Sequence, residues 1–166
     1  MEITVDLTRK DYADFNKYYF LKKRLKRSFY IVLVGAFIIT VFLNIDSPFD
    51  LETYLLTFLM SATIYCLVFF GWMLFAMKLT GRLPSENGSI LGKKKFKVTD
   101  EGLLEESESN TNLQKWKGIK SVETNENSVF IFVDKIAAYV IPKRFFKDEA
   151  QQNDFIRIIE QKMGTV

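Results

Sequence analysis

Two long stretches without a charged residue constrain this chain more than any other feature. They cover residues 28–45 and 53–77. As an α-helix, the first stretch would be about 27 Å long, close to the ~30 Å thickness of a bilayer's hydrocarbon core. The second is longer and would cross with some tilt. Buried helices of a soluble core rarely run this far without a charge, so we predict a hairpin of two transmembrane helices.

The charges that flank these stretches predict how the hairpin is oriented. Basic residues gather before the first stretch and after the second, whereas the connecting loop is acidic and has no basic residue. The basic residues are Lys22, Lys23, Arg24, Lys26, Arg27, Lys78, Arg82 and Lys93 to Lys95, and the acidic ones are Asp46, Asp50 and Glu52. Because basic flanks stay on the cytoplasmic side, we predict both termini in the cytoplasm and a short external loop.

The two stretches themselves indicate a structural role. Ala36 and Thr40 stand four residues apart, as do Thr57, Ser61 and Tyr65, so both helices would carry small or hydroxylated side chains on one face. Such faces allow two helices to pack closely. Neither stretch contains an ionisable Asp, Glu, Lys, Arg or His, and such groups mark the paths of ions and protons across membranes. A channel or a transporter is therefore disfavoured.

The N-terminal segment predicts one strand followed by a helix. Ile3, Val5 and Leu7 alternate with polar residues, which is the period-two pattern of a half-buried strand. Thr8 is followed three residues later by Asp11, a pairing typical of a helix N-terminus with an acidic residue in its first turn. We therefore expect a helix that begins near Thr8 and continues toward the first apolar stretch.

After the second apolar stretch the pattern changes to short strands separated by turn residues. We predict strands at residues 95–99, 103–108, 113–116, 119–124, 129–133 and 137–141. From Lys147 onward, Phe155, Ile158, Ile159 and Met163 recur at helical spacing and predict an amphipathic helix. Together with the N-terminal strand, about seven strands and a closing helix indicate a small antiparallel barrel or sandwich capped by a helix.

A few single residues have expected roles in this sheet region. We expect Gly102 to end a turn in which a side chain would be strained, Trp116 to fill the core and Pro142 to end the last strand. Lys143 and Arg144 follow directly. They would either grip an acidic partner or lipid phosphates, or point into solvent beside the helix start.

Several segments together carry a family resemblance. They are TRKDYADF at residues 8–15, the basic cluster before the first apolar stretch, FKVTDEGL at 96–103, WKGI at 116–119 and AYVIPKRF at 138–145. With these segments the chain resembles the YcxB-like family of bacterial membrane proteins, and the last segment is the most specific. The resemblance implies a bacterial inner-membrane protein with a cytoplasmic domain like a pleckstrin-homology fold. It adds little chemistry, because the family's own function is largely uncharacterised.

These observations predict an α+β membrane protein built from six parts. The parts are an N-terminal strand and cytoplasmic helix (1–27), a first transmembrane helix (28–45), an external loop (46–52), a second transmembrane helix (53–77), a linker (78–92) and a cytoplasmic YcxB-like domain (93–166). The fold class is therefore a two-helix transmembrane hairpin joined to a small antiparallel β barrel or sandwich with a C-terminal helix.

The sequence offers almost no support for enzymatic activity. It has no His and a single Cys. The first fact removes the commonest general base and metal ligand, and the second excludes an intramolecular disulfide. The sequence also lacks a Gly-rich phosphate loop and a Ser nucleophile motif. We therefore expect no catalytic residue, no metal and no cofactor.

We expect instead a non-catalytic protein whose cytoplasmic domain binds a protein partner or the membrane surface. The candidate contact residues are Lys93, Lys94, Lys95, Lys143 and Arg144. If they converge on one basic surface, lipid is favoured, whereas an exposed apolar patch or an open sheet edge favours protein.

Other classes of function stay open or are disfavoured by the same observations. An alternative is a membrane-resident immunity factor against a membrane-active toxin, which only the size and topology allow. Homo-oligomerisation in the membrane also stays open. Nucleic-acid binding is not expected, because the basic residues follow the predicted membrane boundary rather than one continuous face.

Overall fold

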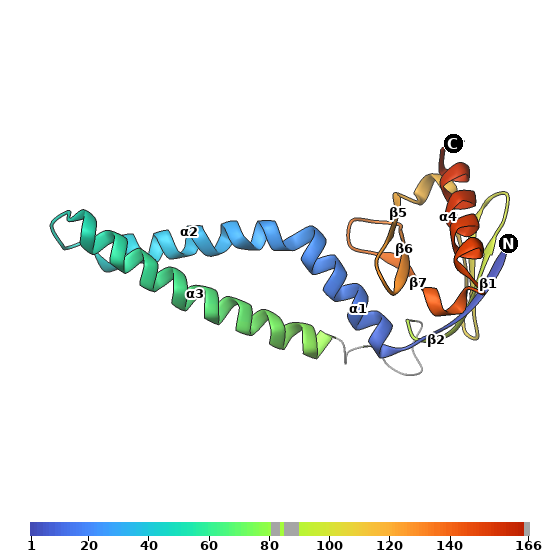
Figure 1. The fold of residues 1–166 in the computed structure, drawn as a ribbon, viewed down its shortest axis with the longest axis horizontal. Helices are drawn as coiled ribbons and strands as arrows, with labels where there is room; N and C mark the ends of the chain where they lie inside the picture. Colours follow the sequence, from blue (N-terminus) through green and yellow to red (C-terminus); the bar gives the residue numbers. More distant parts are fainter. Residues whose placement is uncertain (81–83, 85–89, 165–166) are drawn as a thin grey trace. The chain divides into compact units, whose positions relative to one another are not determined.

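The structure, a computed structural model, describes residues 1–80, 84 and 90–164. The chain forms two compact units, one made of Lys17–Thr80 and the other of Met1–Asn16 together with Gly81–Val166. We call them the helical unit and the sheet domain and describe each by itself (Figure 1).

The helical unit contains the two apolar stretches as long helices. Helix α1 (Arg9–Tyr19) begins in the sheet domain, and a π-helix, η1 (Phe20–Arg24), links it to α2 (Leu25–Leu43); α3 covers Leu51–Thr80. The predicted bounds of the first span, 28–45, differ from those of α2 at both ends. Helix α2 starts earlier because the basic cluster is itself helical, and it stops at Leu43 because Asn44 turns the chain, accepting a backbone hydrogen bond from Ser47.

The two long helices pack through the face that the spacing predicted. Thr40 Oγ1 and Ser61 Oγ lie 3.0 Å apart, and the Ser61 hydroxyl also donates to the Ala36 carbonyl at 3.3 Å. The ring of Tyr65 lies so close to Gly35 that an added Cβ would approach its carbons to 2.9 Å. Small and hydroxylated side chains therefore bring the two backbones together, as expected for paired apolar helices.

The remaining surface of these helices is strongly apolar and open. Large side chains such as Phe42 (73% exposed), Leu67 (70%) and Trp72 (69%) point away from the helix pair. Within the described residues, Arg9–Leu43 and Leu51–Leu79 are two helical stretches long and apolar enough to cross a membrane. The helical unit therefore has the composition and length of a membrane hairpin.

The sheet domain holds two antiparallel sheets and a C-terminal helix. The first sheet has the order β1-β2-β3-β4, and the second has the order β5-β6-β7. The strands are β1 (Glu2–Leu7), β2 (Gly92–Val98), β3 (Gly102–Ser107), β4 (Thr111–Lys115), β5 (Ser121–Thr124), β6 (Ser128–Phe132) and β7 (Ala138–Pro142). Two short 3-10 helices, η2 (Trp116–Gly118) and η3 (Lys143–Phe145), follow β4 and β7, and α4 covers Glu149–Gly164. Each predicted strand is present, with ends shifted by a few residues.

Of the two predicted alternatives, a barrel or a sandwich, the structure excludes the closed barrel, because the strands form two separate sheets. Among the described residues, no ladder joins β4 to β5 or β1 to β7. The chain leaves the first sheet at η2, where Trp116 turns inward and its indole Nε1 donates to the Asp100 carbonyl at 3.0 Å. The indole is buried, as predicted. After this turn the next hairpin, β5–β6, belongs to the second sheet.

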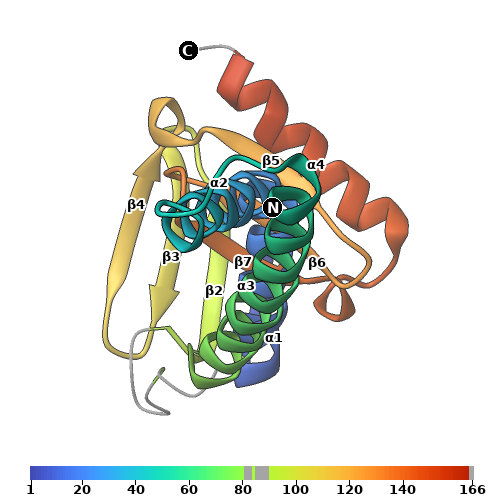
Figure 2. The same ribbon diagram turned by 90° about the vertical axis from the view of Figure 1, so that its left-hand side faces the viewer.

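Both sheets and α4 contribute to one hydrophobic core. Its fully buried side chains include Phe96 and Leu103 of the first sheet, Phe130 of the second, and Phe155 and Ile159 of α4. Figure 2 shows α4 lying along the side of the domain away from β4. The N-terminal strand is an integral part of this core, because β1 pairs along β2 with Ile3 opposite Phe96.

The expectation that a side chain would be strained at Gly102 is confirmed, but the cause is not the conformation of the turn. Gly92 is the described residue with a positive φ, at +92°, whereas Gly102 has no such strained backbone. A Cβ on Gly102 would instead collide with the backbone carbonyl of Gln114 on β4. Close strand-to-strand approach, rather than turn strain, therefore requires glycine there.

The predicted linker, 78–92, starts inside helix α3, which continues to Thr80, and ends at Gly92, the first residue of β2. Most of the segment between them, residues 81–83 and 85–89, lies outside the described residues.

Candidate functional site

The three candidate lysines of β2 point to two different faces of the first sheet. Side chains alternate along a strand, so Lys93 and Lys95 share the outer face. There Lys93 lies opposite Asp6 of β1, and Lys95 has β1 on one side and Glu106 of β3 opposite it on the other. Lys95 Nζ lies 2.8 Å from a carboxylate oxygen of Glu2. This hydrogen bond lowers the pKa of Glu2 and raises the pKa of Lys95. Carboxylates on both neighbouring strands, β1 and β3, therefore lie beside these lysines, so the outer face is not a continuous basic surface.

Lys94 points inward and forms a nearly buried ion pair. Its Nζ lies 2.6 Å from Glu105 Oε1 on β3, and the two side chains are only 10% and 14% exposed. Beside them, the Tyr139 hydroxyl of β7 accepts a hydrogen bond from Asn112 Nδ2 at 2.8 Å. Burial, together with the negative charge of Glu105, raises the pKa of Tyr139 above its ordinary value. The ion pair lies within the first sheet, and the hydrogen bond between Asn112 and Tyr139 joins β4 to β7 of the second sheet.

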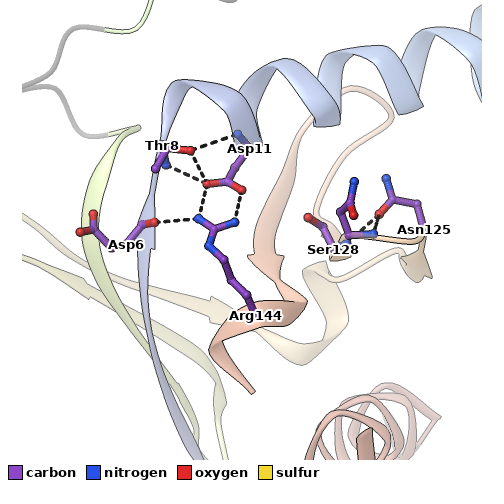
Figure 3. A network of polar contacts seen from close by, with 7 residues as sticks. Asp6, Thr8, Asp11, Asn125, Ser128 and Arg144 are labelled. Carbon is purple, nitrogen blue, oxygen red and sulfur yellow. Dashed lines mark hydrogen bonds and ion pairs between the residues drawn. The ribbon is translucent and has the colours of Figure 1, made fainter. Parts of the chain in front are cut away.

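Arg144 lies on η3 and holds Asp11 in a two-pronged ion pair (Figure 3). Its Nη1 and Nη2 donate to Asp11 Oδ1 and Oδ2 at 2.6 and 2.7 Å. Nη2 also donates to the Asp6 carbonyl at 3.3 Å. The Asp11 side chain is 6% exposed, whereas the Arg144 side chain is 50% exposed. The guanidinium thus ties the start of α1 and the end of β1 to the segment that follows β7.

The same Asp11 carboxylate caps helix α1. The Thr8 backbone N–H and hydroxyl donate to Asp11 Oδ2 at 2.9 and 2.7 Å, which is the helix start that the sequence predicted. Burial raises the pKa of Asp11, but the hydrogen bonds from Arg144 and Thr8 outweigh it and leave the pKa below its ordinary value. The sequence pattern revealed the cap but not Arg144, because that partner lies 133 residues along the chain.

The structure does not collect the five candidate contact residues into one unpaired basic surface. Lys94, Lys95 and Arg144 each have a carboxylate partner. Lys143 is half-buried beside Arg144, and its backbone N–H donates to the Asn127 carbonyl at 2.8 Å. Lys93 is exposed on the outer face of the first sheet. A cationic surface for lipid phosphates is therefore largely neutralised within the domain itself.

A cavity of about 360 Å³, partly open to solvent, lies in the sheet domain, and sequence reasoning did not find it. Its walls come from the end of β1 and the start of α1, from the inner face of β2 and β3, and from residues 136–140. Lys94, Glu105 and Tyr139 line it together with Phe15 and Phe96. We call it the sheet-domain cavity.

Fold and site together define an α+β protein in which an apolar helix pair accompanies a two-sheet domain with a partly open cavity. A family model described as YcxB-like protein matches residues 98–159, from the end of β2 into α4. This match confirms the family resemblance and identifies a YcxB-like domain in the chain. No curated protein and no solved structure matches the chain.

Proposed function

We propose that the protein is a non-catalytic binding module anchored in the bacterial inner membrane, with α2 and α3 as the anchor and both termini in the cytoplasm. The exposed apolar surface of the helical unit carries this proposal. In water that surface would cost about 25 cal/mol for each Å² exposed, and soluble proteins rarely expose such a large continuous apolar area. A lipid bilayer would remove this whole apolar surface from water. The acidic loop and the basic flanks support the proposed orientation.

The sheet domain is proposed to have a pleckstrin-homology-like fold. A four-stranded and a three-stranded antiparallel sheet, followed by a C-terminal helix, agree with the fold that the family resemblance implies. In this proposal α4 covers one side of the two sheets, and binding takes place on surfaces that α4 leaves open.

A protein partner is better supported than the membrane surface as the ligand of this domain. Three of the five candidate basic residues are already paired with carboxylates. By contrast, β4 is an edge strand with one neighbour, β3 (Figure 2). Its side chains are mostly exposed. Such an edge can accept an extended segment of a partner as an additional strand. We propose that β4 binds a partner in this way.

Site-specific photo-crosslinking in native membranes tests this proposal. A photoreactive amino acid is placed at Thr111 or Leu113, which share one face of β4, and at the exposed Glu126 of the β5–β6 turn as a matched control. We expect both β4 positions, but not position 126, to crosslink one extended segment of the same protein. Crosslinks to phospholipid alone would favour the membrane surface instead and contradict a protein partner.

The anchor is tested separately by washing the same membranes at alkaline pH. An integral hairpin stays in the pellet together with its lipid. Release of the chain into the supernatant would contradict the membrane anchor, whatever the crosslinking shows.

A further inference from the structure

The sheet-domain cavity has the size of a small-molecule site. Its volume of about 360 Å³ falls within the range of natural ligand pockets. At liquid density this volume holds about twelve waters, so it suits a ligand of about a dozen non-hydrogen atoms. All its described lining residues belong to the sheet domain.

Most of the lining is apolar. Phe15 and Phe96 supply aromatic surface, and Leu7 and Val140 add aliphatic side chains. Ile136 also lines the cavity and is 61% exposed, so an apolar side chain marks its solvent-facing part. A ligand that fills the cavity must therefore bury a mainly apolar body.

The charged groups of the cavity already balance each other. Lys94 and Glu105 are the charged residues among its described lining, and they form an ion pair at 2.6 Å. An anionic or cationic ligand would bring an uncompensated charge into a largely desolvated space, or would have to separate this pair, and either is unfavourable. An uncharged ligand leaves the pair intact.

One buried donor in the cavity wall lacks a partner. Asn16 lines the cavity, and its amide Nδ2 is buried without a hydrogen-bond partner within the described part of the chain. Buried donors are nearly always paired, so an unpaired one calls for an explanation. A hydrogen-bond acceptor on a bound ligand would satisfy it.

We propose that the sheet-domain cavity binds a small uncharged amphiphile, with its apolar body against Phe15 and Phe96 and its hydrogen-bond acceptor on Asn16 Nδ2. Such an amphiphile comes either from the bilayer, as a lipid fragment with an uncharged head, or from the aqueous phase. This binding is independent of the proposed contact at the β4 edge.

Photoaffinity labelling of the full chain in phospholipid nanodiscs tests the proposal. The probe is a ten-carbon primary alcohol that carries an alkyl diazirine, and mass spectrometry locates the labelled residues. Three competitors with the same number of carbons carry an uncharged, an anionic or a cationic head: decanol, decanoate and decylammonium. We expect labelling of peptides that contain Phe15, Phe96 or Ala138, and at least tenfold better competition by decanol than by either charged competitor. Labelling in α2 and α3 reports simple partition into the bilayer.

Two variants and a matched control separate binding from folding. Asn16→Leu removes the unpaired donor, so cavity labelling should fall about two- to tenfold, as expected for one hydrogen bond. Its thermal stability should stay the same or rise. Ala138→Leu narrows the cavity and should also reduce labelling. Asn153→Leu, at an exposed position on α4, is the control and should label like the wild type.

The outcomes distinguish both the site and the source of its ligand. Labelling confined to α2 and α3, equal competition by all three head groups, or unchanged labelling of a folded Asn16→Leu variant would overturn the proposal. Competition by monoolein built into the nanodisc bilayer would assign a membrane source. Competition by decanol without competition by monoolein would argue against a bilayer lipid as the source, and either result supports the cavity.

Discussion

Breaking the Asp11–Arg144 pair should destabilise the sheet domain in a markedly asymmetric way. Arg144→Met leaves the Asp11 carboxylate buried with Thr8 as its remaining partner. Removing one partner of a buried pair costs about 3–5 kcal/mol. Because the Arg144 side chain is half-exposed and partly screened by water, we expect a loss at or just below the lower end of that range, about 2–3 kcal/mol.

The reverse change should cost less. Asp11→Asn leaves the Arg144 guanidinium without its carboxylate, but water can solvate a side chain that is half-exposed. The lost charge-assisted hydrogen bonds should therefore cost about 1–2 kcal/mol. Because the two residues act on one interaction, the double variant should cost less than the sum of the single variants. A matched control is Arg157→Met, which breaks an exposed pair with Asp154 on α4 and should cost less than about 1 kcal/mol.

Tryptophan fluorescence measures this loss of stability in the sheet domain alone. The chain has two Trp residues, Trp72 in α3 and Trp116 in the core of the sheet domain. In a Trp72→Phe background, guanidinium titration of the full chain in micelles therefore reports unfolding of the sheet domain through Trp116. Equal costs for Arg144→Met and Asp11→Asn, or a cost of Arg144→Met no larger than that of Arg157→Met, would refute the reasoning.

The same pair sets a dependence on pH. The folded-state pKa of Asp11 is lowered, so its stabilisation is fully present above the unfolded-state pKa of about 3.9. It is lost as the pH falls below that value and passes through the folded-state pKa. The stability difference between wild type and Asp11→Asn should therefore be constant near neutral pH and shrink below about pH 4. A difference that grows on acidification would contradict this assignment.

Three further predictions follow from single contacts. Gly102→Ala should destabilise the sheet domain by about 1–3 kcal/mol through its collision with β4, whereas Gly164→Ala, with open space around it, should be neutral by the same Trp116 titration. Lys94→Met should cost about 3–5 kcal/mol because it leaves Glu105 buried and unpaired. Adding Glu105→Leu should restore most of the lost stability. No recovery in the double variant would argue against a simple ion pair. Thr40→Val should weaken the α2–α3 pairing by about 0.6 kcal/mol, the usual size of a hydrogen bond between membrane helices. A steric-trap unfolding measurement can detect this loss. A larger loss would mean that the substitution disturbed packing rather than the hydrogen bond.

Local patterns in the sequence predicted the secondary structure well. Period-two alternation located the strand that contains Ile3, Val5 and Leu7, and helical spacing located α4 through Phe155 and Ile159. These signals are local, because each depends on which face of an element is buried. Helix ends were less certain, because Asn44 stops α2 through a turn that the apolar pattern does not contain.

Properties that depend on distant contacts could not be predicted in the same way. Seven strands are compatible with one barrel or with two sheets, and the choice is made where Trp116 turns into the core between β4 and β5. Likewise, Gly102 is required by the backbone of Gln114, which only the β3–β4 register brings near. Sequence alone indicated that a glycine matters there, but it gave the wrong reason.

In the candidate site, too, local patterns predicted some features, and others depend on distant contacts. Spacing identified Thr8 and Asp11 as a helix start. For Arg144 the sequence left open a partner, lipid phosphates or solvent, because nothing local connects it to Asp11. The sheet-domain cavity forms only where three separate chain segments meet, so no short sequence motif predicts it. Asn16 in particular is an ordinary helical Asn until the fold buries its amide without a partner.

Cysteine accessibility tests the proposed membrane topology most directly. Cys66, the single native cysteine, is replaced by Ser, and one new cysteine is introduced by Ser47→Cys in the loop between α2 and α3 or by Glu126→Cys in the sheet domain; both positions are exposed. A membrane-impermeant maleimide is then added to bacteria whose outer barrier has been opened but whose inner membrane is intact. We predict that position 47 reacts at once, whereas position 126 reacts only after the inner membrane is permeabilised. Reaction of position 126 in intact cells, or protection of position 47, would contradict a membrane hairpin that holds the sheet domain in the cytoplasm.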